Sequence, residues 1–515
     1  MTNKDMMISK KDKKIRVRMA PSPTGSLHIG GVRTALYNIL FAKQHGGTAV
    51  LRIEDTDDAR STKEFEQDIL NSFHWAGIVF DEGVMPATAG KPDGSEKGEF
   101  GPYRQKARLE LYAKYLQQLL SEHKAYYCFC TKEELEARRQ SQESAGQVPK
   151  YSGKCRSYTE LDIAKSLAEG KESVIRFKVV PEKIGMTDLI RGEVEFDNAL
   201  SGDIVIAKSM SEPLYNFAVV IDDHEMQISH VIRGEEHLAN TPKQIALAQA
   251  LGFGSPQYAH LPLILSATGK GKMSKRDGGT TVREYREAGY LPEALINFLV
   301  LIGWHPAPEQ STVRGEVRPV GSREILSFEE MVELFSLDRV QKGGAKFDKQ
   351  KLDFFNAHYI KQLSVSRLVS CLVEGGFCDP SWSKESLALA IPLVQERMVT
   401  LADFQELSGF FFELPEYAAS VLVWKKSNAA AAKTNLQYCF DLLQELPDQI
   451  FTKESLEPKI MKVAEQFGKG DVLWPLRVAV SGKENSPPPV EILVALGKHE
   501  SLRRLKIALQ KLAVA

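Results

Sequence analysis

The sequence predicts an α/β fold in which a doubly wound sheet is interrupted by an α+β insertion and followed by an all-α C-terminal part. Three observations support this prediction. Strand-like and helix-like patterns alternate near the N-terminus. Within residues 172–208, β-branched residues occur at alternating positions, as in β-strands. Beyond residue 352 the pattern is helical almost throughout. A chain of 515 residues is too long for one hydrophobic core, so about three or four domains are expected.

The first predicted elements surround a turn rich in proline and glycine, residues 21–31. We expect a strand over Ile15 to Met19, a helix over Val32 to Gln44, and a second strand over Ala49 to Ile53. A helix entrance exposes backbone N–H groups at the positive end of the helix dipole and so favours a phosphate. His28 stands at this entrance and can add a hydrogen-bond donor. A plain βαβ turn with a structural histidine explains the stretch equally well.

Charged residues follow the next predicted strands. They occur in residues 52–57, at the end of the apolar run Leu214 to His224, which we interpret as a buried strand, and in residues 231–237. The carboxyl ends of strands in a doubly wound sheet face the ligand crevice. An acid of residues 52–57 can therefore hold a ligand ammonium group, and Arg233 can pair with a carboxylate. The alternatives are a solvated loop for the acid and a surface ion pair with a neighbouring glutamate for Arg233.

Soft metal ligands cluster between the two halves of the predicted sheet. Cys128 and Cys130 are followed by Cys155, with Tyr151 four positions before it. Three thiols in such a group suggest zinc, with an oxygen or histidine completing the tetrahedron. Buried reduced thiols are the alternative. Six cysteines scattered over this length do not suggest a disulfide framework.

A basic stretch, residues 270–279, carries four cations within seven residues and has glycines on both sides. A cationic loop of this kind can close over phosphates and neutralise the charge that develops in phosphoryl chemistry. A solvated basic loop is the alternative.

The composition is that of an ordinary globular protein, with 43% hydrophobic and 26% charged residues. Because the net charge is −1, a nucleic-acid partner has to be met by local basic patches. No apolar run approaches the roughly 20 residues of a membrane span, so no membrane partner is expected. Residues 1–14 are lysine-rich and polar with no apolar leader region, which predicts a flexible extension. Together with the scattered cysteines, this predicts a cytoplasmic protein.

These motifs together resemble a known family. Residues 21–30 and Lys272-Met273-Ser274-Lys275-Arg276 resemble the two signatures of class I aminoacyl-tRNA synthetases. Further segments narrow the resemblance to bacterial-type glutamyl-tRNA synthetase: residues 18–25, 52–57, 101–105, 215–217, 222–224 and 231–235. The first signature departs from the usual pattern because Gly31 stands where it often ends in histidine.

The resemblance implies a reaction in which ATP with Mg²⁺ and L-glutamate give glutamyl-adenylate, and the glutamyl group then passes to the 3′ terminal adenosine of tRNA(Glu). It implies His28, Lys272 and Lys275 as catalytic residues, with ATP bound by these and by Gly30, Ser274 and Arg276. For glutamate it implies Arg18 and Tyr215 on the side-chain carboxylate and Arg233 on the main-chain carboxylate. Glu54 and Ser22 would take the ammonium group, and Ala20 would line the same site.

The resemblance also implies a structural zinc ion held by Cys128, Cys130, Tyr151 and Cys155. Some relatives end this motif with Cys-x-His, whereas Ser157 stands at that position here, and a tyrosine at the spacing of Tyr151 serves as the fourth ligand in others.

The domains implied by analogy are a Rossmann-type catalytic domain split by a connective insertion, a stem-contact domain and an anticodon-binding domain. Their expected bounds are 1–14 for the extension, 15–114 and 213–268 for the catalytic halves, 115–212 for the insertion that handles the acceptor end, 269–360 for the basic loop and stem contacts, and 361–515 for the helical anticodon-binding part. A monomer is expected.

Three rival functions stay open at this point. Glutaminyl-tRNA synthetase would need a site without paired cations, and another nucleotidyltransferase would lack the helical C-terminal third. A non-enzymatic RNA-binding relative would be expected to have lost His28 or Lys275, and both are present. The sequence leaves open whether tRNA(Gln) is charged as well as tRNA(Glu).

Overall fold

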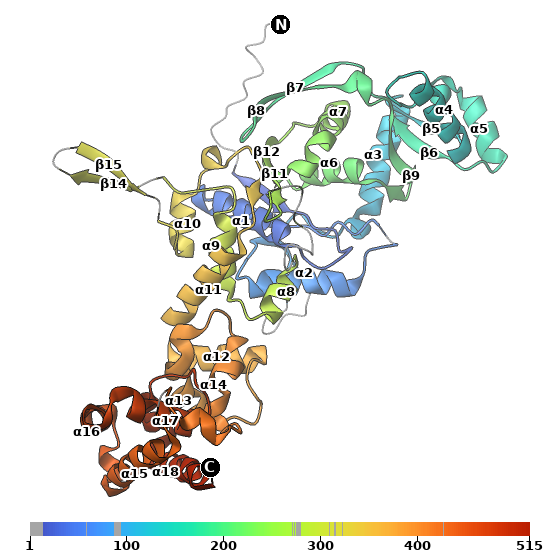
Figure 1. Ribbon diagram of the computed structural model, residues 1–515. Helices are drawn as coiled ribbons and strands as arrows, with labels where there is room; N and C mark the ends of the chain where they lie inside the picture. The colour runs from blue at the N-terminus through green and yellow to red at the C-terminus, as the bar shows by residue number, and fades with distance from the viewer. Residues whose placement is uncertain are drawn as a thin grey trace. The chain divides into compact units, whose positions relative to one another are not determined.

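The computed structural model describes residues 14–514 except 58, 87–93, 270, 272, 274–279, 308, 314–315, 322 and 426, with the backbone alone along 309–321. The chain divides into two compact units. The first comprises Met1–Glu284 and Leu295–Lys349, and the second comprises Tyr285–Ala294 and Gln350–Ala515. Figure 1 gives the elements of both.

The first unit begins with the βαβ pattern that the sequence predicts. It contains β1 (Arg16–Met19), α1 (Ile29–Gln44), β2 (Thr48–Leu51), α2 (Lys63–Trp75), β3 (Glu82–Val84) and β4 (Glu96–Lys97). Strands β1, β2 and β3 are parallel neighbours, and β4 pairs antiparallel with β3. Helix α2 starts after Thr62, whose hydroxyl accepts a hydrogen bond from Phe65 N.

The sheet continues on the other side of β1. Strand β11 (His230–Gly234) pairs in parallel with β12 (Gln257–Leu261), and η4 (Glu235–Asn240) and α7 (Thr241–Leu251) connect them. Ser229 N, just before β11, donates a hydrogen bond to Arg16 O at the start of β1. The spatial order is therefore β3-β2-β1-β11-β12. From β1 the chain adds strands toward one edge of the sheet, and from β11 it adds them toward the other edge, so the strand order reverses between β1 and β11. In a doubly wound sheet a ligand binds at such a switch point, outside the carboxyl ends of the strands.

The apolar run Leu214 to His224 is a helix, and the predicted strand is wrong. Helix α6 spans Tyr215–Glu225. Its residues 217–222 are all buried, so the run carries no polar face that would reveal a helical period. A short run that is apolar all round is compatible with a buried strand or a buried helix, and periodicity alone does not separate them.

The insertion contains α3 (Leu109–Ser121), which follows η1 (Gln105–Arg108), and then two β-structures. One sheet has the order β10-β9-β6-β5, and its members are β5 (Ala125–Cys128), β6 (Val174–Phe177), β9 (Ile204–Ser209) and β10 (Glu212–Pro213). Between β5 and β6 lie α4 (Lys132–Ser144), η2 (Lys154–Ser157) and α5 (Glu160–Ala168). The hairpin of β7 (Lys183–Asp188) and β8 (Gly192–Asp197), followed by η3 (Asn198–Leu200), instead joins β12, where Tyr258 pairs with Asp188.

Shorter elements follow β12 and lead toward the second unit. They are β13 (Ile264–Leu265), α8 (Val282–Glu287), α9 (Pro292–Val300), the hairpin of β14 (Glu309–Val313) and β15 (Glu316–Gly321), α10 (Phe328–Leu334), η6 (Leu337–Arg339) and β16 (Ala345–Lys346). Strand β13 pairs in parallel with β16.

The second unit is helical, as predicted. Its helices are α11 (Lys349–Gln362), α12 (Val365–Gly375), α13 (Lys384–Val394), η7 (Gln395–Arg397), α14 (Asp403–Phe412), η8 (Ala419–Leu422), α15 (Ala429–Glu445), η9 (Asp448–Ile450), α16 (Lys453–Phe467), α17 (Lys469–Ser481) and α18 (Pro489–Val514). Helices α15 to α18 enclose one core that includes Leu436, Leu476 and Leu505. The predicted fold class is confirmed. Over the described residues, every helix is too short or too polar to cross a membrane.

Candidate active site

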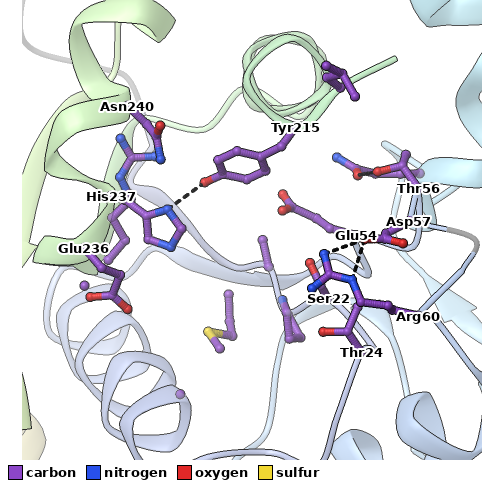
Figure 2. Close-up of a pocket in the computed structure, with 18 of the residues that line it drawn as sticks. Ser22, Thr24, Glu54, Thr56, Asp57, Arg60, Tyr215, Glu236, His237 and Asn240 are labelled. Atoms are coloured by element: carbon purple, nitrogen blue, oxygen red, sulfur yellow. Dashed lines mark hydrogen bonds and ion pairs between the residues drawn. The ribbon is translucent and has the colours of Figure 1, made fainter. Parts of the chain in front are cut away.

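A pocket of about 860 Å³ opens at the switch point between β1 and β11. Figure 2 shows side chains on opposite sides of this pocket, with His237 on one side and Glu54 on the other. The segment after β1 supplies one wall, and the segment after β11 together with η4 supplies the opposite wall. All six residues predicted for glutamate and the predicted Gly30 line this single pocket: Arg18, Ala20, Ser22, Gly30, Glu54, Tyr215 and Arg233.

Arg233 is a buried cation without a carboxylate partner among the described residues. Its Nη1 donates to Gln244 Oε1 at 2.8 Å, its Nη2 to Thr241 Oγ1 at 2.8 Å and its Nε to His260 Nε2 at 3.2 Å. The surface ion pair with a neighbouring glutamate is therefore wrong for this residue. A guanidinium carries five N–H groups, so two stay available for an anion in the pocket.

Glu54 belongs to a buried network of charges behind the pocket. Its Oε1 accepts from Arg52 Nη2 at 3.0 Å, and Arg52 also pairs with Asp223 at 2.8 Å. Asp223 pairs with Arg18 at 3.2 Å. Burial raises the pKa of Glu54, while the guanidinium groups of Arg52 and Arg18 counteract this. The network fixes the Glu54 carboxylate at the pocket wall, where it can meet a cation.

The acids of α6 do not face the crevice, contrary to the expectation drawn from a strand. Asp222 is fully buried and accepts from Arg108 Nε at 2.7 Å, Gln105 Nε2 at 2.8 Å and the hydroxyl of Tyr112 at 2.8 Å. These contacts fasten α6 to η1 and α3. Tyr215, at the start of the same helix, reaches the pocket and lies 3.1 Å from His237 Nδ1 (Figure 2). Burial and the nearby Arg233 lower the pKa of His237 to about 4.

His28 occupies the N-cap position of α1. Its Nδ1 accepts a hydrogen bond from Gly30 N at 3.1 Å. The neutral ring therefore carries its proton on Nε2, which can donate to an anion at the helix entrance. This geometry supports a phosphate site at the turn and is also compatible with a capping role for His28. Nδ1 caps the helix, and Nε2 is the nitrogen that can donate to a phosphate.

Described residues within and after the basic loop are hydrogen-bonded to β13 and to the start of α1. Met273 N donates to Ile264 O at 3.0 Å, and Ile29 N donates to Thr280 O at 3.0 Å. Val282 N donates to Leu27 O at 3.0 Å. The chain thus enters the loop beside β13 and leaves it beside the helix entrance that carries His28. The predicted residues Lys272, Ser274, Lys275 and Arg276 themselves lie outside the described residues.

The predicted metal ligands come together in the insertion. The sulfur atoms of Cys128, Cys130 and Cys155 lie within 4.8 Å of one another. The hydroxyl of Tyr151 lies 3.3 Å from Cys128 Sγ and 3.5 Å from Cys130 Sγ, and Cys130 Sγ lies 3.7 Å from Cys155 Sγ. Tetrahedral zinc with bonds of about 2.3 Å separates its sulfur ligands by about 3.8 Å. The donor set and its spacing fit a structural zinc site.

Further polar residues line the pocket, among them Asp57, Arg60, Lys208, Glu236 and Asn240. Asp57 and Glu236 belong to the charged segments 52–57 and 231–237 that the sequence indicates, whereas the other three lie outside them. Asp57 and Arg60 form an exposed ion pair of 2.5 Å at one side (Figure 2). Asn240 ends η4, the segment directly after β11, so the position of that strand end could have indicated it. Lys208 comes from the insertion, and no local signal connects it to the pocket.

Comparison with known families agrees with this geometry. The family described as tRNA synthetases class I (E and Q), catalytic domain, matches residues 14–354, and an anticodon-binding domain matches residues 356–509. The chain belongs to the class I tRNA synthetases for glutamate and glutamine.

Relatives of similar length support this membership. The chain is 43% identical over 505 residues to the glutamate–tRNA ligase of Carboxydothermus hydrogenoformans, covering 95% of this chain and 99% of the relative. It is 45% identical over 513 residues to glutamate–tRNA ligase 1 of Caldicellulosiruptor saccharolyticus, covering 96% and 98%. A crystal structure of a glutamate tRNA ligase from Elizabethkingia meningosepticum in complex with its amino acid matches with a TM-score of 0.82, 35% identity and coverage of 97% and 99%.

Proposed function

We propose that this class I synthetase is a glutamate–tRNA ligase that forms glutamyl-adenylate from ATP and L-glutamate and transfers the glutamyl group to tRNA(Glu). The observation that carries the proposal is the pocket at the switch point, which is lined both by the buried Arg233, without a carboxylate partner among the described residues, and by the buried carboxylate of Glu54. The relatives that match over nearly their whole length are named glutamate–tRNA ligases.

The pocket matches the charges of glutamate. Glu54, together with Ser22, would receive the ammonium group, and Arg233 would receive the main-chain carboxylate through its two remaining N–H groups. Arg18 and Tyr215 would bind the side-chain carboxylate, with Asp223 holding the Arg18 guanidinium in place. Such positioning brings the reacting carboxylate to the α-phosphorus of ATP, which is the main requirement of an in-line displacement.

The helix entrance would serve the nucleotide. His28 Nε2 can donate to a phosphate oxygen while Gly30 leaves the backbone close to the ligand. Lys272 and Lys275 would neutralise the charge that develops on the leaving pyrophosphate, with Ser274 and Arg276 as further contacts. Magnesium would arrive with ATP and would help to neutralise the charge of its phosphates.

Discrimination against glutamine follows from the buried cations. Glutamine has no second carboxylate, so it would offer Arg18 and Tyr215 a neutral amide and replace a charge-assisted hydrogen bond by a weaker one. This difference favours the glutamate ligase over the glutaminyl enzyme of the same family.

The remaining parts of the chain would hold the tRNA. Residues 115–212 would meet the acceptor end, residues 269–360 the acceptor stem, and residues 361–515 the anticodon, in keeping with the family match over residues 356–509. Recognition of unpaired anticodon bases rests on stacking and on contacts to base edges. We expect the protein to be cytoplasmic. We also expect it to be a monomer, and light scattering would test this oligomeric state.

The cysteine cluster would hold a structural zinc ion. Cys128, Cys130 and Cys155 would supply three thiolates and Tyr151 the fourth donor atom. Bound zinc would join the end of β5 to η2, two segments far apart in the insertion.

The deciding experiment is the charging of radiolabelled glutamate onto purified tRNA(Glu) and tRNA(Gln) in separate reactions. Charging of tRNA(Glu) alone indicates a discriminating enzyme, and charging of both indicates a non-discriminating one. Charging of neither by folded protein with ATP and magnesium would contradict the proposal.

The role given to the basic loop has its own test. Lys275→Ala should abolish adenylate formation while tRNA binding stays close to that of the wild type. An equal loss of both would contradict a role in phosphoryl chemistry.

A further inference from the structure

The orientation of Arg233 depends on a chain of buried side chains behind it. His260 and Asp188 are both fully buried, and neither lines the pocket. His260 Nε2 faces Arg233 Nε at 3.2 Å, and His260 Nδ1 faces Asp188 Oδ2 at 2.7 Å. The three side chains thus run in series from the pocket wall into the interior.

The contacts determine which nitrogen of His260 carries the proton. Asp188 Oδ1 accepts from the backbone N–H groups of Ile190 and Arg191, each at 2.9 Å, and these bonds favour the ionised carboxylate. Although burial opposes its ionisation, the bonds from His260, Arg191 and Ile190 lower the pKa of Asp188. An ionised acid accepts, so His260 Nδ1 must donate to it. Burial lowers the pKa of His260 below its ordinary value, which leaves Nε2 unprotonated.

An unprotonated Nε2 is the form that Arg233 requires. The Nε–H of Arg233 has to donate, and a proton on His260 Nε2 would oppose it. The opposite tautomer would therefore turn the guanidinium away or break the contact.

We propose that Asp188 and His260 are positioning residues for substrate binding, in which Asp188 fixes the His260 tautomer and His260 orients Arg233 toward the pocket. The inference rests on the proposed role of Arg233 in binding a glutamate carboxylate. The Asp188 carboxylate acts on Arg233 through His260 and does not contact the guanidinium itself. It can therefore orient Arg233 without being a direct ion-pair partner that glutamate would have to displace.

The assignment brings a strand of the insertion into the amino-acid site. Asp188 ends β7, which joins β12 at Tyr258, and Leu189 N donates to Tyr258 O at 2.8 Å. Arg233, His260 and Asp188 therefore lie on three neighbouring strands, β11, β12 and β7. The register pairs Arg233 with His260 across β11 and β12, and Tyr258 with Asp188 across β12 and β7. This alignment places the three side chains in contact.

The first test is Asp188→Asn in the full-length protein. The amide can donate to His260 Nδ1 and so favour the wrong tautomer, and we expect the KM for glutamate to rise about tenfold or more while the KM for ATP changes less than about twofold. Asp203→Asn is the matched control. Asp203 is a buried acid of the same insertion that binds Tyr126, Arg156 and Val179 N, away from the pocket, so its loss should leave the KM for glutamate unchanged.

A second pair of variants separates hydrogen bonding from packing. His260→Gln can keep an oxygen acceptor for Arg233 Nε, whereas His260→Leu fills similar space without one. We expect His260→Gln to stay within about threefold of the wild-type KM for glutamate and His260→Leu to exceed it about tenfold. This comparison also tests the acceptor role of His260 if Asp188→Asn does not fold, because only the glutamine variant offers an oxygen to Arg233 Nε.

Direct binding adds a readout that does not need tRNA charging. The rise in melting temperature caused by glutamate should be smaller in Asp188→Asn than in the wild type and the Asp203→Asn control. An unchanged rise, an unchanged KM, or equal behaviour of the Gln and Leu variants would overturn the positioning role. A wild-type protein that charges no tRNA would instead count against the proposed function.

Discussion

Replacing Glu54 by glutamine tests the electrostatics of the pocket, because the change keeps the shape of the side chain and removes one charge. Behind the pocket, Arg18, Arg52 and Arg108 are matched by Glu54, Asp222 and Asp223. These six groups sum to zero charge. With Glu54→Gln they sum to +1, and the ammonium group of glutamate then meets an amide beside an uncompensated cation.

The expected loss follows from one charge-assisted hydrogen bond. Such a bond contributes about 1.5–3 kcal/mol, so kcat/KM for glutamate should fall about 10- to 150-fold. Arg52 keeps Asp223 at 2.8 Å and Asp222 at 3.6 Å, so the fold should survive. Pyrophosphate exchange or tRNA charging at varied glutamate measures the effect, and circular dichroism monitors folding.

The pH dependence gives a second signature of the same residue. Only the ionised carboxylate attracts an ammonium group, and burial raises the pKa of Glu54 above its ordinary value. In the wild type, glutamate binding should therefore weaken as the pH falls through this raised pKa, and Glu54→Gln should flatten that acid limb.

Glu82→Gln is the matched control for Glu54→Gln. Glu82 also pairs with a buried arginine of the sheet, Arg16 at 2.8 Å, but it does not line the pocket. Its loss should leave kcat/KM for glutamate unchanged. A folded Glu54→Gln protein with less than about a threefold loss, or with the wild-type acid limb, would refute the ammonium assignment.

Three further predictions address the metal cluster and stability. Cys155→Ser should lower bound zinc, measured by mass spectrometry of the purified protein, and a wild type equally free of zinc would contradict the site. Hydrogen bonds from Arg503 and Arg504 lower the pKa of Glu500 from its ordinary value of 4.5 to about 2, although burial opposes this shift. Ionised Glu500 therefore stabilises the fold above pH 4.5, and this contribution is lost as the pH falls toward 2. The melting temperatures of wild type and Glu500→Gln should therefore differ at pH 7 and converge in acid, and a difference that grows in acid would refute the assignment. Gly83→Ala should destabilise the first unit by about 3 kcal/mol or more, because Gly83 has φ +116° and an added Cβ would lie 2.0 Å from Leu51 O; an unchanged melting temperature would contradict this.

Much of the pocket could be predicted from the sequence because its residues follow motifs at strand ends. Arg18 and Ser22 follow from the first turn, Glu54 from the end of the second strand region, and Arg233 from the strand end before η4. Family resemblance then supplied their roles, and the structure gathers them in one pocket.

The failures have a physical origin as well. The run at residues 214–224 is buried on all sides, so its pattern did not separate helix from strand. Asp188 and His260 approach Arg233 through strand register over long separations in the chain, which a single sequence does not display. Lys208 reaches the pocket from β9 of the insertion, a placement that its local sequence does not signal.

The hairpin of β7 and β8 has a consequence for protein engineering. Residues 115–212 read as a self-contained module along the chain, yet this hairpin completes the sheet of β11 and β12. A chimaera that exchanges residues 115–212 as one block would graft a foreign edge strand onto the catalytic sheet. A graft that retains the native β7–β8 hairpin and exchanges only the residues before and after it would preserve the pairing of β7 with β12.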